Sequence, residues 1–256
     1  MSEIRHRQTG AVLLSDSSKS LSQADLRGRN LLGAALPGVD LRGADLRGTD
    51  LCDANLEKGR FDGAYMANST LNVADLSGGT LDRVDASFAR ILATRLHAAS
   101  LRAANLERAS LIWADLSSAD LRDSRCEKAD LTGANLVGAN AAGIDLGQAN
   151  LRDLRASGAN LRGATLAGAS LMGADLSGVD LSGADLGRAL FHGTTLTGTN
   201  LAGALISHTV FAWCPTLADA VGLDRVSFNG PVALDAATFD ACRGKLPKAW
   251  LEAAKG

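Results

Sequence analysis

Histidines, cysteines and aspartates are the side chains with which this 256-residue chain could carry out chemistry. The histidines are scattered along the chain, at His6, His97, His192 and His208. They form no Ser/His/Asp or Cys/His arrangement, and the glycines recur so regularly that Gly-x-x-x-x-Gly spacing has no value as a phosphate-loop motif. We therefore expect exposed histidines without a catalytic role.

The cysteines and carboxylates lead to the same expectation. Cysteines at positions 52, 126, 214 and 242 lack the paired spacing of a metal site, so we expect reduced structural thiols. The aspartates recur at fixed positions, so close pairs follow from the periodicity and do not indicate acid/base catalysis. We expect a protein that is not an enzyme and that binds no cofactor or metal.

The aspartates recur because most of the chain is periodic. From Leu21 to Phe211 a hydrophobic or small residue, usually leucine, stands at every fifth position without insertion or deletion. A period of five fits neither the 3.6-residue period of a helix nor the alternation of a strand. A short fixed period is typical of a solenoid that turns once per repeat.

Each position of the repeat has a physical role. We call the fifth-position residue central; the position two residues earlier is usually alanine, which indicates a second, smaller inward site. Glycine two residues after the central position suits a turn with positive φ, and Asp or Asn just before it can bond nearby backbone. Where the central residue shrinks to Ala141 and Ala156, the small site enlarges to Ile144 and Leu154, which keeps the core volume.

The repeats resemble the pentapeptide repeat family, whose motif is Ala-Asp/Asn-Leu-x-x. Units that carry the resemblance include Ala24-Asp25-Leu26-Arg27-Gly28 and Ala174-Asp175-Leu176-Ser177-Gly178. The resemblance implies an all-β solenoid, a right-handed quadrilateral β-helix with twenty residues per coil, in which residues twenty apart are stacked. We expect this β-helix over residues 21–211, between an N-terminal strand or hairpin cap at 1–20 and a C-terminal helical cap at 212–256.

The two flanks are predicted to cover the sheet edges that repeated coils leave exposed. Residues 2–14 are typical of a small hairpin, and the tail has helix signals at Thr216 to Gly222, at Asp235 to Arg243 and from Pro247. The apolar residues of the tail either pack on the last coil or form a homodimer contact. The candidates for that contact are Phe239, Leu246, Trp250 and Leu251.

The tail also resembles the segment that follows the repeats in some bacterial pentapeptide proteins that carry a signalling TIR domain. The matching residues are Gly222-Leu223-Asp224, Gly230-Pro231, Leu246-Pro247 and Trp250-Leu251. The resemblance implies a recruiting or regulatory role as one alternative. We do not expect the enzymatic activity of a TIR domain, because no such domain follows the tail in this sequence.

Composition and charge limit the partners. The chain is 46% hydrophobic and 21% charged, with no apolar stretch as long as a membrane span and no signal-peptide region, so we expect a bacterial, cytoplasmic protein that does not bind membranes. Some family members bind DNA gyrase as acidic mimics of DNA. Residues 21–211 hold 21 acidic and 18 basic side chains, a net charge of only −3, so gyrase protection is a disfavoured alternative and direct nucleic-acid binding is not expected.

An apolar group is the most distinctive outward feature. It falls in three consecutive predicted coils and consists of Val73, Phe88, Leu92, Ile112 and Trp113. Contiguous exposed apolar residues often mark protein interfaces, in which Trp is enriched. The alternatives are that the flanks cover the group, or that Trp113 lies flat over neighbouring turns. We predict a non-enzymatic protein-binding or scaffold protein, and we expect a distorted loop at Ala86 to Leu96 to present this surface.

Overall fold

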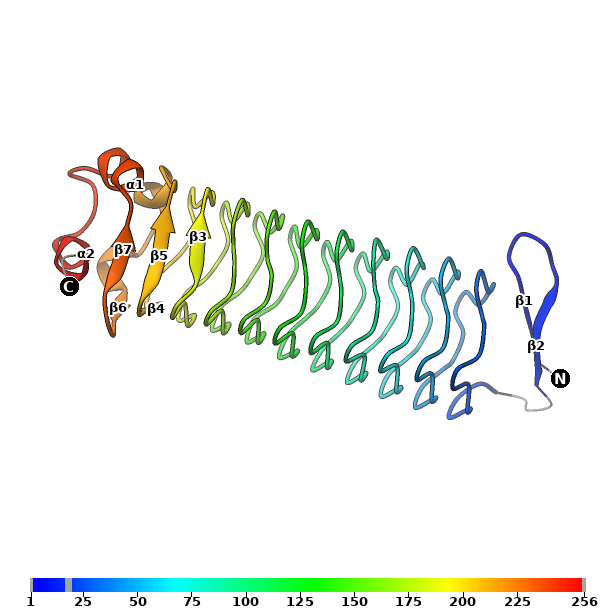
Figure 1. Ribbon diagram of the computed structural model, residues 1–256. Helices are drawn as coiled ribbons and strands as arrows, with labels where there is room; N and C mark the ends of the chain where they lie inside the picture. Colours follow the sequence, from blue (N-terminus) through cyan, green and yellow to red (C-terminus); the bar gives the residue numbers. More distant parts are fainter. Residues whose placement is uncertain (1, 17–19, 255–256) are drawn as a thin grey trace.

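The chain forms a straight rod of stacked coils, seen in a computed structural model that describes residues 2–16 and 20–254 (Figure 1). The residue before each central position forms a parallel bridge with its counterpart twenty residues later, as between Asp25 and Asp45 and between Asp75 and Arg95. Four repeats therefore complete one coil, and residues twenty apart are stacked as predicted.

Each repeat is built around one tight turn. In one such turn the carbonyl of central Leu71 accepts a hydrogen bond of 3.0 Å from the amide of Ala74. Val73, which lies two residues after Leu71, has a positive φ. Gly38, with φ of 66° and open space around it, shows why glycine suits this place. Oδ1 of Asp75 accepts from the amide of Ser77 at 3.0 Å. The predicted roles of the glycines and aspartates are confirmed.

The core is a column of leucine and alanine side chains that runs along the inside of the rod. Most central leucines are no more than about 2% exposed. Ile144 and Leu154 are each 1% exposed, which confirms the predicted compensation for Ala141 and Ala156, and Cys126 is buried at a central position as expected. Burial raises the pKa of the Cys126 thiol to about 12, so this thiol stays protonated.

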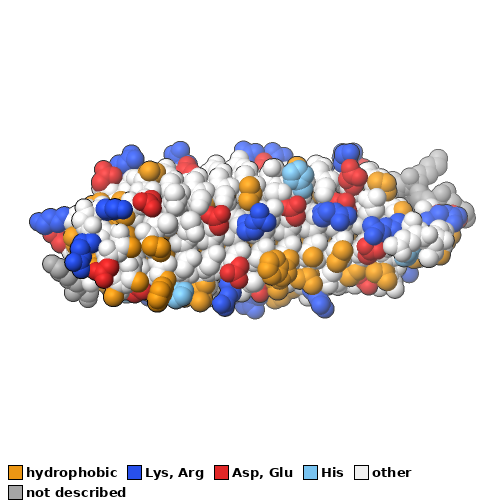
Figure 2. All heavy atoms as spheres, turned by 90° about the horizontal axis from the view of Figure 1, so that it is seen from above, with side chains coloured by type: hydrophobic (Ala, Val, Ile, Leu, Met, Phe, Trp, Pro, Cys, Tyr) orange, Lys and Arg blue, Asp and Glu red, His pale blue; other side chains and the backbone are white. Residues whose placement is uncertain are grey.

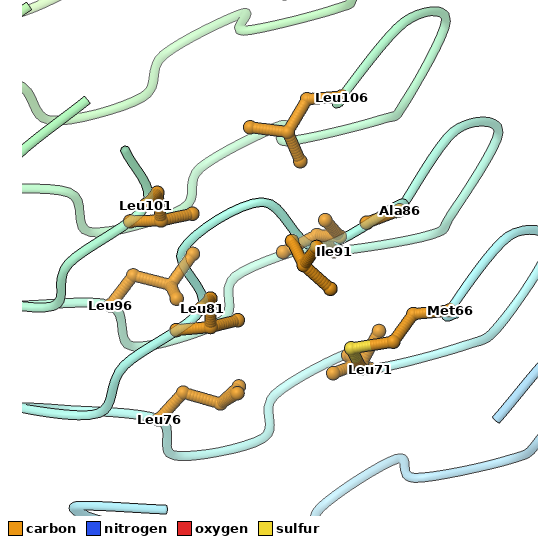
Figure 3. Close-up of a pocket in the computed structure, with 10 residues that line it drawn as sticks. Met66, Leu71, Leu76, Leu81, Ala86, Ile91, Leu96, Leu101 and Leu106 are labelled. Atoms are coloured by element: carbon orange, nitrogen blue, oxygen red, sulfur yellow. The ribbon is translucent and has the colours of Figure 1, made fainter. Parts of the chain in front are cut away.

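One part of the core is packed less completely. A cavity of about 10 Å³ lies beside Ala86, where Met66 and Leu106 are the central residues of the neighbouring coils (Figure 3). Its lining is apolar, and it is at the lower limit of the space that a water molecule needs. Val84 adds volume beside Ala86 but does not close the cavity.

The backbone from Ala86 to Leu96 is regular, so the expected loop distortion there is wrong. Its amides hydrogen-bond to the next coil at 2.7–3.0 Å, for example from Ile91 to Ser110 and from Leu96 to Asp115. Arg90, Leu92 and Arg95 project outward, and Ala86 is buried beside the cavity. None of these residues disturbs the twenty-residue register.

The N-terminal segment forms a hairpin of β1 (Ser2–Arg5) and β2 (Val12–Asp16). The segment after β1 runs antiparallel to the first coil, with a bridge between His6 and Ala34 and a 2.8 Å hydrogen bond from the amide of Ala35 to the carbonyl of Arg5. Ile4 is buried. Residues 1 and 17–19 of the expected N-terminal cap lie outside the described residues.

Parallel pairing continues beyond Phe211, where the repeats were expected to end. β3 (Leu190–His192), β5 (Thr209–Ala212) and β7 (Val232–Leu234) form one sheet, and β4 (Leu205–Ile206) pairs with β6 (Ser227–Phe228). The partners are now Leu205 with Ser227 and Thr209 with Val232. The spacing grows because two short 3₁₀ turns, η1 (Leu217–Asp219) and η2 (Leu223–Arg225), are inserted into the coil.

Two short helices follow, α1 (Ala236–Ala241) and α2 (Lys248–Ala253). Asp235 caps α1 by accepting from the amide of Thr238 at 2.9 Å. The helix expected from Thr216 to Gly222 is only the short turn η1. Thr216 does not cap it, because its hydroxyl accepts from the amide of Leu196 in the preceding coil at 2.9 Å.

Trp250 of α2 closes the C-terminal end of the core. It is fully buried, with its ring centroid 5.6 Å from that of Phe211 and 5.4 Å from that of Phe228. Its indole Nε1 donates to the carbonyl of Leu223 at 3.0 Å. Phe211 in turn stacks on Phe191 at 4.6 Å, so aromatic rings continue the leucine column to the tail.

Candidate protein-interaction face

The apolar residues predicted from the sequence lie together on one side of the rod. Backbone hydrogen bonds join their turns directly, from the amide of Val73 to the carbonyl of Leu92 at 2.9 Å and from that of Ala93 to Ile112 at 2.9 Å. Phe88 stands at the preceding corner of the same coil as Leu92. We call the set of Val73, Phe88, Leu92, Ile112 and Trp113 the Trp113 face.

The Trp113 face is open to solvent. Trp113 is 62% exposed, Val73 50%, Phe88 49% and Leu92 36%, and Ile112 is partly buried. The N-terminal hairpin bonds to the first coil and the C-terminal elements to the last coils, so neither flank covers this side within the described residues. Figure 2 shows groups of hydrophobic side chains near one long edge of the rod, separated by charged and polar ones.

Three of these residues are placed where the backbone disfavours them. Val73, Phe88 and Trp113 occupy the turn position with positive φ, at 63°, 58° and 58°. For L-residues this conformation costs roughly 1–2 kcal/mol, and bulky or β-branched residues are rarely found there. Glycine would fit this position without strain, as it does at Gly38.

Trp113 also contacts the next coil. A Cβ atom added at Gly133 would lie 2.3 Å from Cζ3 of Trp113, so the indole lies directly against this buried glycine. Trp113 therefore lies over a neighbouring turn, as one of the alternatives proposed, and one face of its ring is in contact with that turn. The exposed fraction of 62% shows that most of the side chain still faces solvent.

Charged groups border the Trp113 face. The guanidinium of Arg108 lies 5.6 Å from the centre of the Phe88 ring, in the range of a cation–π contact. Arg95 bonds to Asp75 at 2.9 Å. Arg90 is exposed and forms no ion pair within the part of the chain that the structure describes.

Asp115 lies two residues after Trp113 and accepts hydrogen bonds from Ser117 and Asn135. Burial raises its pKa, but hydrogen bonds from the hydroxyl and amide of Ser117 and from Asn135 outweigh this effect and hold the pKa below its ordinary value. Asp115 is therefore ionised at neutral pH.

Charges elsewhere on the rod are largely paired with each other. Arg42 bonds to Asp40 within one turn at 2.7 Å, and Arg122 bonds to Asp120 in the same way at 2.7 Å. The hydrogen bond from Arg42 lowers the pKa of Asp40 to about 2. Arg102 is bound to Asp82 of the preceding coil in a similar way.

One histidine, one serine and one aspartate come together although the sequence pattern did not indicate it, because His97 and Asp115 both contact the hydroxyl of Ser117. Among the described residues no group of three or more His, Cys, Asp or Glu side chains could hold a metal ion. Nδ1 of His97 lies 3.0 Å from Oγ of Ser117, whose hydroxyl donates to Asp115, so this hydroxyl is held as a donor and not activated as a nucleophile. No helix in the described part of the chain has the length and hydrophobicity needed to span a bilayer.

The tail residues suggested as a cap or dimer contact separate into two groups. Trp250 and Leu246 are 0% and 8% exposed and pack within the chain, whereas Phe239 is 40% exposed and Leu251 is partly buried. Trp250 therefore contributes to the cap and is not accessible to a second molecule. Of these four residues, Phe239 is the most exposed.

Sequence reasoning missed one residue that supports this site, Gly133, and one that provides a matched comparison outside it, Trp213. Trp213 is on the same side of the rod near its C-terminal end, with φ of 52° and the same 62% exposure as Trp113. Its position two residues after central Phe211 could have identified it. Gly133 is one of many glycines, and only the twenty-residue stacking distinguishes it as the neighbour beneath Trp113.

These features define an all-β solenoid that offers an extended face instead of a pocket. The family model described as pentapeptide repeats matches eight copies, over residues 20–57 and 94–211. The chain belongs to the pentapeptide repeat family, whose members fold as right-handed quadrilateral β-helices and are generally non-enzymatic scaffolds. Residues 58–93, which include Val73, Phe88 and Leu92, continue the same coil.

Solved structures of the same family are similar to the chain. HetL, a regulator of heterocyst differentiation from the cyanobacterium Nostoc, is 27% identical over 82% of this chain and 93% of its own, with a TM-score of 0.36. A thylakoid lumen protein of Arabidopsis thaliana is 30% identical over 35% of this chain and 63% of its own, at 0.35. QnrB1, a plasmid-mediated fluoroquinolone resistance protein, is 21% identical over 87% and 95%, at 0.28. The comparison with curated proteins found no match.

Proposed function

We propose that this protein is a rigid, non-enzymatic scaffold that binds another protein through the Trp113 face. The observation that carries the proposal is the coincidence of strain and exposure at Val73, Phe88 and Trp113. Glycine would relieve the strain, and a polar residue would remove the exposed apolar area. Their presence is explained most simply by a partner that buries them.

A regular β-helix suits this role. Its coils are joined by backbone hydrogen bonds of 2.6–3.3 Å along the whole rod, so the outward side chains of successive coils keep fixed positions. Binding to such a surface orders few backbone groups, and this limits the entropy lost on association. Trp113, already fixed against Gly133, serves as the anchor.

The charge pattern argues against the DNA-mimic alternative. A mimic of duplex DNA requires a dense, uncompensated negative surface. Here acidic side chains such as Asp25, Asp40 and Asp120 each bond an arginine two residues later. A recruiting or regulatory role is compatible with a scaffold. The identity of the bound partner would show whether the scaffold has such a role.

The test is a pull-down that compares wild-type protein with Trp113→Glu and Trp213→Glu. Both tryptophans have the same exposure and a similar φ, so both variants should retain the fold equally, as thermal unfolding would check. We expect a partner to be retained by wild type and Trp213→Glu and lost with Trp113→Glu. Equal retention by both variants would contradict the proposal, and gyrase subunits among the retained proteins would favour the alternative.

A further inference from the structure

We propose that a second copy of this chain binds the Trp113 face, with the two rods side by side and antiparallel. The inference rests on the proposed function and names the partner at that face. The two-fold axis lies midway between the Leu92–Ala93 turn and the Ile112–Trp113 turn. Rotation about this axis reverses the direction of the rod and the direction of the chain within each coil. A residue a given number of positions before the midpoint of the two turns therefore faces the residue the same number of positions after it in the second copy.

Large side chains meet small or apolar ones in this arrangement. The axis places Trp113 opposite Leu92 of the second copy and Ile112 opposite Ala93. Because the indole extends over Gly133, it also approaches the turn of Asn72 and Val73 of the second copy. Symmetry forms each contact twice, so apolar surface that is now open to solvent at Trp113 and Leu92 is covered on both copies.

The same axis pairs charges of opposite sign. Arg90, which forms no ion pair among the described residues, comes to face Asp115 of the second copy. Arg155, likewise without an ion pair among the described residues, faces Asp50. Arg152 faces Asp53, although within one copy Arg152 already lies 3.8 Å from Asp153 and Asp53 already bonds to Arg7 at 2.5 Å. These pairs lie on the coils at and beyond both ends of the apolar contacts.

One pair of like charge also forms, between Asp75 and Asp130 of the second copy. Its repulsion is reduced because Arg95 already bonds to Asp75 at 2.9 Å. Complementary charge mainly fixes the register of an interface and disfavours alternatives. The three opposite pairs therefore outweigh the single unfavourable one.

Neighbouring registers are worse. A shift of the axis by half a coil towards the N-terminus places Arg90 opposite Arg95. A shift by half a coil towards the C-terminus places Asp50 opposite Asp175 and keeps only one pair of opposite charge, Arg95 with Asp130. The register centred between the two turns forms more pairs of opposite charge than either neighbour, so it is the preferred antiparallel register.

The contact is modest in size. From Asp50 to Arg155 it spans about five coils, or about 24 Å at ~4.8 Å per coil. One side of a narrow rod over this length falls below the ~800 Å² per partner of a standard interface. We therefore expect a reversible dimer whose fraction rises with concentration.

Sedimentation equilibrium of the purified chain over a wide concentration range tests the inference. We expect a monomer–dimer equilibrium in which Trp113→Glu raises Kd by at least about tenfold, because a charge would be buried at the centre. Trp213→Glu and Phe239→Glu lie outside the contact and should leave Kd unchanged. A monomer at every concentration, or a dimer lost only with Phe239→Glu, would overturn the inference.

A charge exchange tests the register. Arg90→Asp and Asp115→Arg should each raise Kd by roughly threefold to tenfold, and the double variant should restore it to within about threefold of wild type. A double variant weaker than either single variant would overturn the register. If the chain is monomeric while the pull-down retains a different protein through Trp113, the second-copy inference fails and the proposed function stands.

Discussion

At the residue scale, one turn position determines both the strain and the surface of this protein. Twenty non-glycine residues have a positive φ, and every one of them lies two residues after a central position. Small or polar residues accept this place at moderate cost, whereas the bulky apolar residues Val73, Phe88, Trp113 and Trp213 are exceptional there. The side chain at this position points outward, so it can change the surface without changing the core.

The contact between Trp113 and Gly133 gives a prediction at this scale. Gly133→Ala should lower the free energy of unfolding by about 1 kcal/mol more than Gly38→Ala, because both have φ near +65° but only the new Cβ at Gly133 meets the indole. Chemical denaturation of the two variants measures the difference. In the Trp113→Gly background the difference should disappear; if it persists, the ring does not occupy this space.

Sequence periodicity predicted most of this residue-level detail, but not all of it. The five-residue repeat identified inward and outward positions, and it placed all five residues of the Trp113 face on the outside. It did not identify Gly133 as the support of Trp113, because one glycine of the repeat resembles another. Whether Arg90 finds a partner depends on side-chain geometry, which spacing alone does not determine.

At the scale of the coil, packing and charge pairing are repeated with local exceptions. The coil with Ala141 and Ala156 is filled by Ile144 and Leu154, whereas the coil with Ala86 keeps a cavity of about 10 Å³ (Figure 3). The compensation could be read from the sequence because all four residues lie in one coil. The cavity could not be, because Val84 suggests the same kind of compensation.

The two coils should respond oppositely to the same substitution. Ala86→Val should raise the free energy of unfolding by about 0.5–1 kcal/mol, because it extends into the cavity. Ala141→Val should lower it by about 1–3 kcal/mol, because that coil is already filled. Denaturant unfolding of both variants gives the comparison, and equal destabilisation would show that the cavity cannot accept a side chain.

The turn ion pairs predict a dependence on pH. The hydrogen bond from Arg42 lowers the pKa of Asp40 from 3.8 to about 2, so its stabilisation is present above about pH 4 and is lost as the pH falls towards 2. Thermal unfolding between these pH values should show a smaller loss of stability for Arg42→Gln than for wild type. Identical pH profiles would mean that the pair does not persist in solution.

At the scale of the whole molecule, the rod is a linear stack in which each coil contacts mainly its neighbours. The period predicted this architecture because one rule repeats from Leu21 to Phe211. It failed beyond Phe211, since insertions at η1 and η2 change the spacing while parallel pairing continues through β6 and β7. The helices predicted near Asp235 and from Pro247 correspond to α1 and α2, whereas only the short turn η1 follows Thr216.

Linear stacking predicts that damage at one end stays local. Trp250→Ala removes the ring from between Phe211 and Phe228 and should destabilise the C-terminal coils by about 3–5 kcal/mol. Hydrogen exchange should accelerate from about β4 onward and remain unchanged near the Trp113 face. Trp250→Phe should show a weaker effect. Faster exchange along the entire rod would contradict the linear description.

The most direct measurement of the central claim compares two tryptophans within one molecule. Trp113 and Trp213 are equally exposed, so brief oxidative labelling of the dilute purified protein should modify both to a similar extent. In concentrated lysate we predict that Trp113 is protected relative to Trp213, because a bound protein covers the Trp113 face. Equal modification of the two residues in the lysate would contradict the account.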